Sequence, residues 1–136
     1  MRAELLRREL IDLALVAGGA IPGALLRWQL AQLLSDGGRP LPPWLDGTLV
    51  ANLAGCLLIG ILVAQPPRRA RLFLWGGVGF SGALTTFSTW MLQLTQALQA
   101  GRVADAVVTL VLPLAGGLAL TALGYRLGRG HLRQDA

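Results

Sequence analysis

The stretch GFSGALTTFSTW, from Gly79 to Trp90, decides how the chain folds. It lies within an uncharged run, Leu72–Gly101, that is too long and too apolar for an ordinary soluble helix. Because unpaired backbone groups are costly in lipid, helices normally cross a membrane without a break. The glycines and hydroxyl groups of this stretch are typical instead of irregular backbone that protein or water surrounds. The sequence therefore predicts a helix that is interrupted near residues 81–86 and holds an ion there.

The rest of the chain supports a membrane protein. Two further uncharged runs, Gly47–Pro67 and Ala106–Tyr125, reach the roughly 20 residues that cross a bilayer. A shorter run, Leu13–Leu26, continues through Arg27 and is interpreted as another span. Only 14% of the residues are charged, against roughly 25% in soluble domains. We expect an all-α membrane protein with one integral membrane domain, residues 1–136, and four transmembrane helices at about 10–34, 47–64, 71–100 (broken mid-membrane near 81–86) and 103–128.

The charge pattern predicts an orientation. The net charge is +5, and all twelve basic residues are arginines. With four spans, nine of these arginines fall on one side, in the two terminal segments and the connection between the second and third spans. This distribution is that of membrane-flanking charge and argues against nucleic-acid binding. The positive-inside rule places both termini in the cytoplasm of a multi-pass protein of the cell membrane.

Polar residues within the first two spans have two interpretations each. Thr48 and Asn52 are four residues apart and share a helix face. Asn52 is either a hydrogen-bonding contact between helices or an amide N–H donor offered to a passing anion. Arg27 either extends its side chain to the membrane interface or lines a vestibule that attracts anions.

Aromatic residues follow the predicted interruption. Phe87 and Trp90 are three apart on one helix face. Aromatic rings have electropositive edges, against which a small anion can rest without a full positive charge to trap it. The alternative is that both rings pack against lipid or neighbouring helices.

Some functional classes are disfavoured. None of the seven acidic residues lies deep in a span, whereas a proton-coupled exporter needs a titratable group in the membrane. This argues against a small multidrug antiporter. The sequence contains no Walker loop, metal-ligand cluster or nucleophile–base pair, so we expect that it is not an enzyme.

Three motifs, taken in order, resemble the CrcB family of Fluc-type fluoride channels. They are GGAIPGALLRW in the first span, GTLVANLAG in the second and GFSGALTTFSTW in the third, where TTFST is the most specific part. The resemblance covers nearly the whole chain. It implies a passive, fluoride-specific channel that exports fluoride from the cytoplasm and so lowers its toxicity. It also implies an antiparallel dimer in the lipid membrane, formed with an inverted copy or a paralogue, in which two narrow pores flank a central structural Na⁺ that is not transported.

The resemblance also implies roles for individual residues. The Na⁺ ligands would be the backbone carbonyls of Gly82 and Thr85, because a broken helix exposes the oxygen atoms that a hard cation prefers. The anion-pore residues implied are Asn52, Phe87, Trp90, Thr48, Thr89 and Arg27.

The chain departs from the family pattern at three positions. Trp90 stands where the family has a second pore phenylalanine, and Thr109 and Pro113 fall where its fourth helix usually offers a tyrosine and a serine to the pore. A larger ring could narrow the passage, and proline has no hydroxyl to give. Together with the nine-to-three arginine distribution, these departures leave an alternative open: a non-conducting or half-conducting subunit of a heterodimeric fluoride channel, inserted in one orientation.

Overall fold

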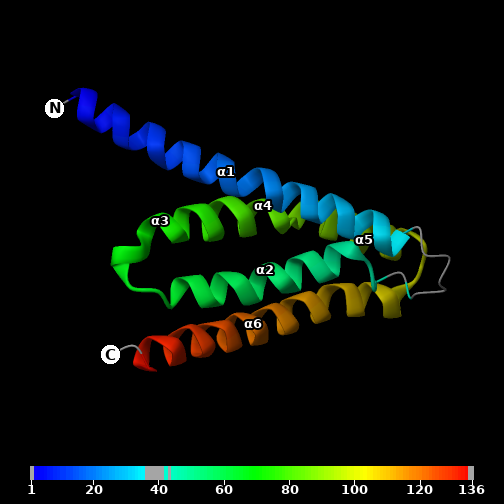
Figure 1. The fold of residues 1–136 in the computed structure, drawn as a ribbon. Helices are drawn as coiled ribbons and strands as arrows, with labels where there is room; N and C mark the ends of the chain where they lie inside the picture. Colours follow the sequence, from blue (N-terminus) through cyan, green and yellow to red (C-terminus); the bar gives the residue numbers. More distant parts are fainter. Residues whose placement is uncertain (1, 36–41, 43, 135–136) are drawn as a thin grey trace.

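All regular structure in the described part of the chain is helical (Figure 1). The computed structural model describes residues 2–35, 42 and 44–134. The elements are α1 (Arg2–Ser35), α2 (Gly47–Val63), η1 (Pro67–Arg69), α3 (Ala70–Leu72), η2 (Phe73–Ser81), α4 (Gly82–Leu84), α5 (Phe87–Gln99) and α6 (Val103–Gln134). The predicted all-α class is confirmed.

Two of these helices are long and apolar enough to cross a membrane. Arg2–Leu34 and Val103–Gly130 have mean hydropathies of 1.6 and 2.2 in their most apolar windows. α2 is also apolar, and its 17 residues lie at the lower end of the roughly 17–25 that span a bilayer. Both α1 and α6 extend beyond the spans expected at about 10–34 and 103–128, because their charged flanks are rich in leucine, arginine and glutamate or glutamine, which favour helix.

Between α4 and α5 the backbone is extended. Thr85 has φ −81° and ψ 153°, and Thr86 has φ −145° and ψ 126°. Both residues lie within the range 81–86 in which the sequence predicts an interruption. Thr86 starts the next helix as its N-cap, since its side-chain oxygen accepts a hydrogen bond from the backbone N–H of Thr89.

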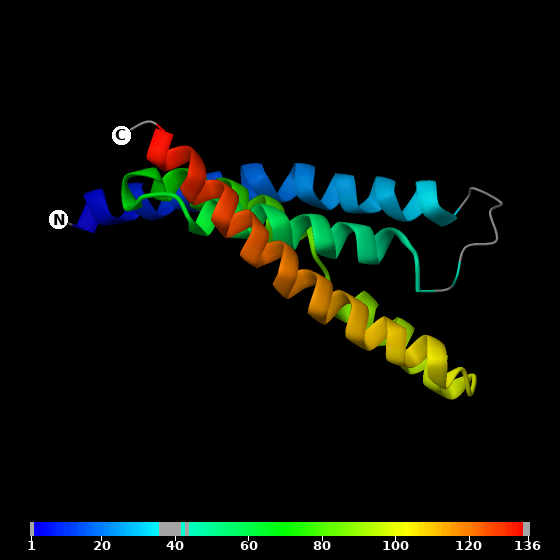
Figure 2. The ribbon, with the colours of Figure 1, turned by 90° about the horizontal axis from the view of Figure 1, so that it is seen from below.

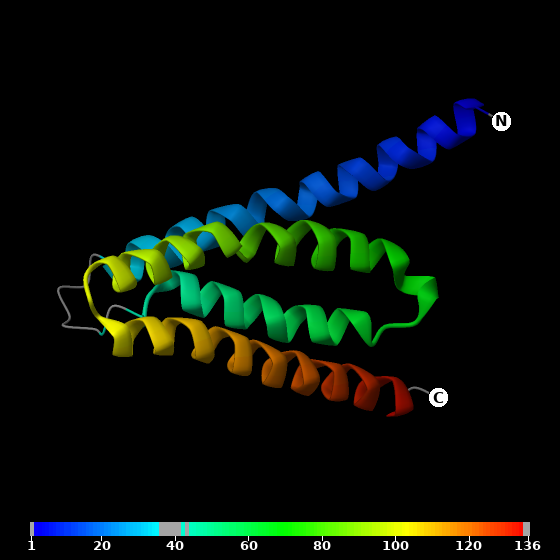
Figure 3. The same cartoon turned by 180° about the vertical axis from the view of Figure 1, so that it is seen from behind.

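The segments before and after the interruption pack against different helices. Before it, η2 and α4 pack against α1, whereas after it α5 packs against α6. Figure 2 shows α5 diverging from α1 and α2 to lie along the first half of α6, and Figure 3 shows from behind the turn that joins α5 to α6. α2 contacts both α6 and η2 and so connects the two halves.

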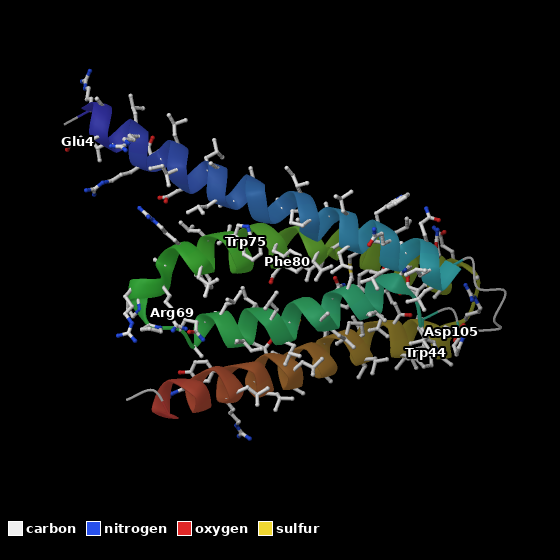
Figure 4. All side chains as sticks on the ribbon, in the orientation of Figure 1. Glu4, Trp44, Arg69, Trp75, Phe80 and Asp105 are labelled. Atoms are coloured by element: carbon white, nitrogen blue, oxygen red, sulfur yellow. The ribbon has the colours of Figure 1, made fainter. Side chains whose placement is uncertain are left out.

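Glycines allow the helices to approach closely. A methyl group at Gly19 would overlap the carbonyl oxygen of Trp75, and one at Gly23 would overlap that of Phe80. The GxxxG spacing of α1 therefore brings its backbone against η2. On η2, the rings of Trp75 and Phe80 stack with centroids 6.2 Å apart, and Figure 4 places both residues beside α1.

The surface carries the large apolar side chains. Leu33 and Leu118 expose 73% and 74% of their surface, and many other leucines, isoleucines and valines are exposed along the helices. Among the described residues the buried apolar side chains are few, and several of them are alanines. Small residues between helices and large apolar residues outside suit a chain surrounded by lipid, where hydrophobic burial does not drive helix association.

Most arginines gather at one end of the molecule. Both termini and the η1 turn lie at that end (Figure 1), and the turn contributes Arg68 and Arg69. Arg102 lies at the opposite end, between α5 and α6, and Arg39 falls outside the described residues. This arrangement has the sidedness that the charge pattern requires, while the orientation in a membrane stays a prediction.

Candidate functional site

The side chain of Asn52 supports the interruption. Its Nδ2 donates to the carbonyl oxygen of Thr86 at 3.1 Å, and its Oδ1 accepts from the backbone N–H of Thr86 at 2.8 Å. Thr86 is extended, and the amide of α2 pairs with both its N–H and its carbonyl across 34 positions of sequence. One side chain therefore forms hydrogen bonds with both backbone polar groups of the residue that separates the two helical segments.

Arg27 supports the other side of the interruption. Its Nε donates to the carbonyl oxygen of Ala83 at 3.1 Å. Ala83 lies in the last turn of α4, where carbonyl groups lose their helical partners and a cation is favourable. Arg27 therefore contacts the carboxyl end of the first half-helix, a partner that neither sequence interpretation named.

The carbonyl groups at the interruption differ in their hydrogen bonds. The carbonyls of Ala83 and Thr86 accept hydrogen bonds from Arg27 and Asn52. Within residues 2–35 and 44–134, those of Gly82, Leu84 and Thr85 accept none, and the N–H of Thr86, four residues after Gly82, pairs with Asn52. The two carbonyls that the sequence nominated as cation ligands are thus left without a hydrogen-bond donor from these residues.

A groove of about 400 Å³ lies beside the interruption. It is formed by α2, the η2–α4–α5 segment and α6, and its lining is mostly apolar with a few polar groups. The lining residues are Asn52, Gly55, Cys56, Ile59, Gly77, Ser81, Gly82, Thr85, Thr86, Phe87, Trp90, Pro113 and Leu114.

The two aromatic residues of α5 lie along this groove. Their rings meet edge to face, with centroids 5.6 Å apart and planes at 81°. Phe87 is 69% exposed, whereas Trp90 is partly covered and contacts α6. Both residues line the groove, and in an edge-to-face pair the electropositive edge of one ring points at the face of the other.

Trp90 also lines a second, much smaller cavity. This cavity of about 10 Å³ is close to the size of one water molecule. Thr48 lines it and accepts a hydrogen bond from Gln93 Nε2 at 3.3 Å. The full lining is Trp44, Thr48, Leu49, Asn52, Trp90, Gln93, Val108, Thr109, Leu112 and Pro113.

The structure thus groups most of the nominated residues. Asn52 and Trp90 line both cavities, Phe87 lines the groove and Thr48 lines the small cavity. Thr89 lies beside them, and its hydroxyl accepts from Thr86 Oγ1 at 3.2 Å. Arg27 belongs to neither lining and contacts the interruption from the α1 side.

Sequence reasoning missed the contacts that some residues of this region make. Gln93 donates to the carboxylate of Asp46 as well as to Thr48, and so links α5 to the first turn of α2. Ser81 is buried in η2, where its hydroxyl donates to the carbonyl of Gly76 at 2.9 Å. The sequence marks Gln93 only as one of several polar residues at the end of the third span. It does not indicate the hydrogen-bond partners of Gln93, which lie more than 40 positions away.

The sequence matches a family model and many known proteins. The model is that of the CrcB-like protein family, Camphor Resistance (CrcB), and it matches residues 14–125. A protein named fluoride-specific ion channel FluC 2 from Parasynechococcus marenigrum is 46% identical over 127 residues, covering 92% of this chain and 86% of that protein. Proteins named fluoride-specific ion channel FluC from Chromohalobacter salexigens and Bordetella pertussis are 45% and 43% identical over 84% and 85% of this chain, covering 87% and 89% of their own lengths.

The chain belongs to the CrcB family, and the resemblance seen in its three motifs is confirmed. The family and the apolar helices make it a membrane protein. Its relatives are named as ion channels, which agrees with the prediction that it is not an enzyme.

Proposed function

We propose that this member of the CrcB family is a passive, fluoride-specific channel that exports fluoride from the cytoplasm and lowers its toxicity. The observation that carries the proposal is the identity of 43–46% with proteins named fluoride-specific ion channels over most of the chain. The groove beside the interruption supports it, because polar groups and two aromatic side chains line it.

The chemistry of the groove suits a small, strongly hydrated anion. Such an ion enters a low-dielectric passage only where hydrogen-bond donors replace its water. Asn52 uses one amide N–H on Thr86, so its second N–H is left for the anion. The edges of Phe87 and Trp90 add weak electropositive contacts. Several weak sites favour conduction, because a strong site would hold the ion.

The interruption places two opposite helix ends side by side. The carboxyl end of α4 carries partial negative charge, and the amino end of α5, at Phe87, carries partial positive charge. The first suits a cation and the second suits an anion, as in other membrane proteins with discontinuous helices. One break can therefore serve a structural Na⁺ and an anion path together.

The Na⁺ part of the proposal rests on the donor set. The carbonyls of Gly82 and Thr85 would be the ligands, and two from each subunit of an antiparallel dimer would surround the ion. Oxygen ligands fit a hard cation. Their fit is supported by the lack of a hydrogen-bond donor to either carbonyl in the described residues, whereas the carbonyls of Ala83 and Thr86 accept from Arg27 and Asn52.

The test of the main proposal is efflux from liposomes. The purified chain is reconstituted in fluoride-loaded vesicles, and an electrode records fluoride release when valinomycin lets K⁺ balance the charge. We expect release without a proton gradient and no comparable release of chloride. Release that requires a proton gradient, or no release from this chain under any of these conditions, would overturn the proposal.

The Na⁺ site has its own test. An ion that binds only the assembled dimer stabilises it by about 2.7 kcal/mol at 100 times its dissociation constant. We therefore expect the dimer to lose stability of that order when Na⁺ is replaced by N-methylglucamine during purification, and to regain it when Na⁺ is returned. Equal dimer stability in both solutions, measured by cross-linking or size exclusion, would contradict the structural ion while leaving fluoride conduction to its own test.

A second candidate is favoured by the arginine distribution. Nine arginines on one side against three elsewhere predict a single orientation, which an antiparallel homodimer does not allow. The chain would then be one half of a heterodimer with an oppositely inserted paralogue. Fluoride efflux that appears only when such a paralogue is co-expressed selects this candidate, whereas efflux from the single chain selects the homodimer.

A further inference from the structure

Trp90 and Pro113, both departures from the family pattern, bear on the same atom, the backbone carbonyl oxygen of Thr109. The indole N–H of Trp90 donates a hydrogen bond to the backbone carbonyl oxygen of Thr109. Thr109 lies four residues before Pro113 in α6. In an α-helix that carbonyl accepts from the N–H of the residue four positions later, and proline has no N–H. Trp90 thus fills the acceptor that Pro113 leaves open.

We propose that Trp90 and Pro113 form a coupled pair. The proline leaves the Thr109 carbonyl without its helical donor, and the indole N–H binds that carbonyl and so attaches α5 to α6. An unpaired carbonyl inside a membrane is costly, so the proline is tolerated at this depth because a donor from α5 replaces the missing N–H. The indole in turn needs a partner when it is partly buried, and this carbonyl supplies one. Each residue therefore lowers the free-energy cost of having the other at its position.

The pair fixes the ring at a particular place. Trp90 and Pro113 line both the groove and the water-sized cavity, so the anchored ring lies at the boundary between them. A phenylalanine at position 90 has no N–H and could not be held there by the same bond. Trp90 is therefore a positioning residue, which holds α5 against α6 and sets the passage between the two spaces.

The pairing predicts a non-additive effect of two substitutions. Trp90→Phe removes the donor and leaves the Thr109 carbonyl unpaired, whereas Pro113→Ala restores a backbone N–H to that carbonyl. We expect Trp90→Phe to lower fluoride efflux at least fivefold in the native chain and less than twofold in the Pro113→Ala background. Equal fold-changes in the two backgrounds would overturn the coupling, because contacting residues that share a partner should not be additive.

Matched controls exist elsewhere in the chain. Trp75→Phe removes an indole that donates no hydrogen bond within the described residues, and Pro22→Ala changes the other proline inside a long helix. Each should change efflux by the same factor with and without Pro113→Ala. A dependence of Trp75→Phe on the residue at position 113 would show a general effect of α6 and would also overturn the proposal.

A spectroscopic measurement tests the hydrogen bond without relying on the folding of a variant or on fluoride transport. The efflux experiment rests on the proposed function, whereas NMR of the ¹⁵N-tryptophan-labelled native chain does not. With the indole signals assigned by replacing Trp28, Trp44 and Trp75 in turn, the Trp90 indole proton should show the downfield shift of a hydrogen-bonded donor relative to Trp75. A Trp90 signal at the position of an unbonded indole overturns the pair even if Trp90→Phe does not fold.

Discussion

At the scale of the residue, Asn52 is the group on which the extended backbone depends most directly. Replacing it with aspartate keeps its size and its acceptor for the N–H of Thr86, but removes the amide donor and sets a negative charge against the Thr86 carbonyl. We expect the extended backbone at Thr86 to be destabilised by roughly 2–3 kcal/mol. If the same free energy raises the barrier to conduction, fluoride efflux falls by roughly 30- to 150-fold.

A control for this substitution lies on the neighbouring interface. Thr121 donates one hydrogen bond to the carbonyl of Cys56, between α6 and α2. Thr121→Val removes that bond without touching the interruption, and such interhelical bonds are worth roughly 0.6–2 kcal/mol. Efflux and thermal unfolding of both variants check the prediction. An Asn52→Asp channel that conducts as well as Thr121→Val would contradict the role given to Asn52.

Arg27 gives a second prediction at this scale. If its function is to hold the carbonyl of Ala83, a neutral donor of similar reach should replace it in part, whereas a vestibule cation needs its charge. We expect Arg27→Gln to retain most of the efflux and Arg27→Ala to lose about 2 kcal/mol of stability. Efflux that falls equally in both variants, with unchanged stability, would instead support the vestibule interpretation.

The sequence could nominate these two residues but not their partners. A polar or charged residue within an apolar run is conspicuous, and both Asn52 and Arg27 stood out for that reason. Their hydrogen bonds reach Thr86 and Ala83, which are 34 and 56 positions away. Such pairings depend on how the helices pack, so the alternatives for each residue stayed open until the contacts were known.

At the scale of the element, the approach of α1 to η2 depends on a missing side chain. A Cβ at Gly23 would overlap the carbonyl of Phe80, whereas one at Gly18 would have its nearest neighbours at 3.9 Å, on the ring of Trp75. Gly23→Ala should therefore cost about 1–3 kcal/mol through overpacking. Gly18→Ala, on the same helix, should be neutral or stabilise by up to about 1 kcal/mol through helix propensity.

Thermal unfolding of the two glycine variants measures this difference. Equal melting behaviour would show that α1 can shift away from η2 at little cost. Because η2 and α4 lead directly into the extended residues, we also expect Gly23→Ala to lower fluoride efflux more than Gly18→Ala does. The pair of variants thus separates close packing from the general preference of alanine for helices.

The course of the interrupted segment was only half predictable. Glycines and threonines between residues 79 and 89 disfavour a continuous helix, and the extended residues Thr85 and Thr86 fall within that stretch. The change of partner from α1 to α6 carries no local signal, because it depends on which faces remain open after α1, α2 and η2 have packed. The link between Trp90 and Pro113 followed from that change and was invisible in the sequence.

At the scale of the whole molecule, the distribution of arginines makes a prediction about insertion. The termini and the η1 turn lie at one end, and the turn between α5 and α6 lies at the other (Figure 1). The nine-to-three bias predicts that the first end stays in the cytoplasm in every copy. A single orientation in every copy would select the heterodimer candidate, because an antiparallel homodimer needs both orientations of the same chain.

Single cysteines at the two ends test that prediction. In a Cys56→Ser background, Ala70→Cys and Ala100→Cys place exposed thiols in the η1–α3 turn and beside the α5–α6 turn. We expect a membrane-impermeant maleimide added outside intact cells to label Ala100→Cys and not Ala70→Cys. Replacing Arg68, Arg69 and Arg71 with glutamine reduces the bias to six against three and should let some copies insert the other way, so that Ala70→Cys becomes labelled. Equal labelling of both positions in the chain with all its arginines would mean that the native sequence already inserts both ways, and a homodimer would then be the functional unit.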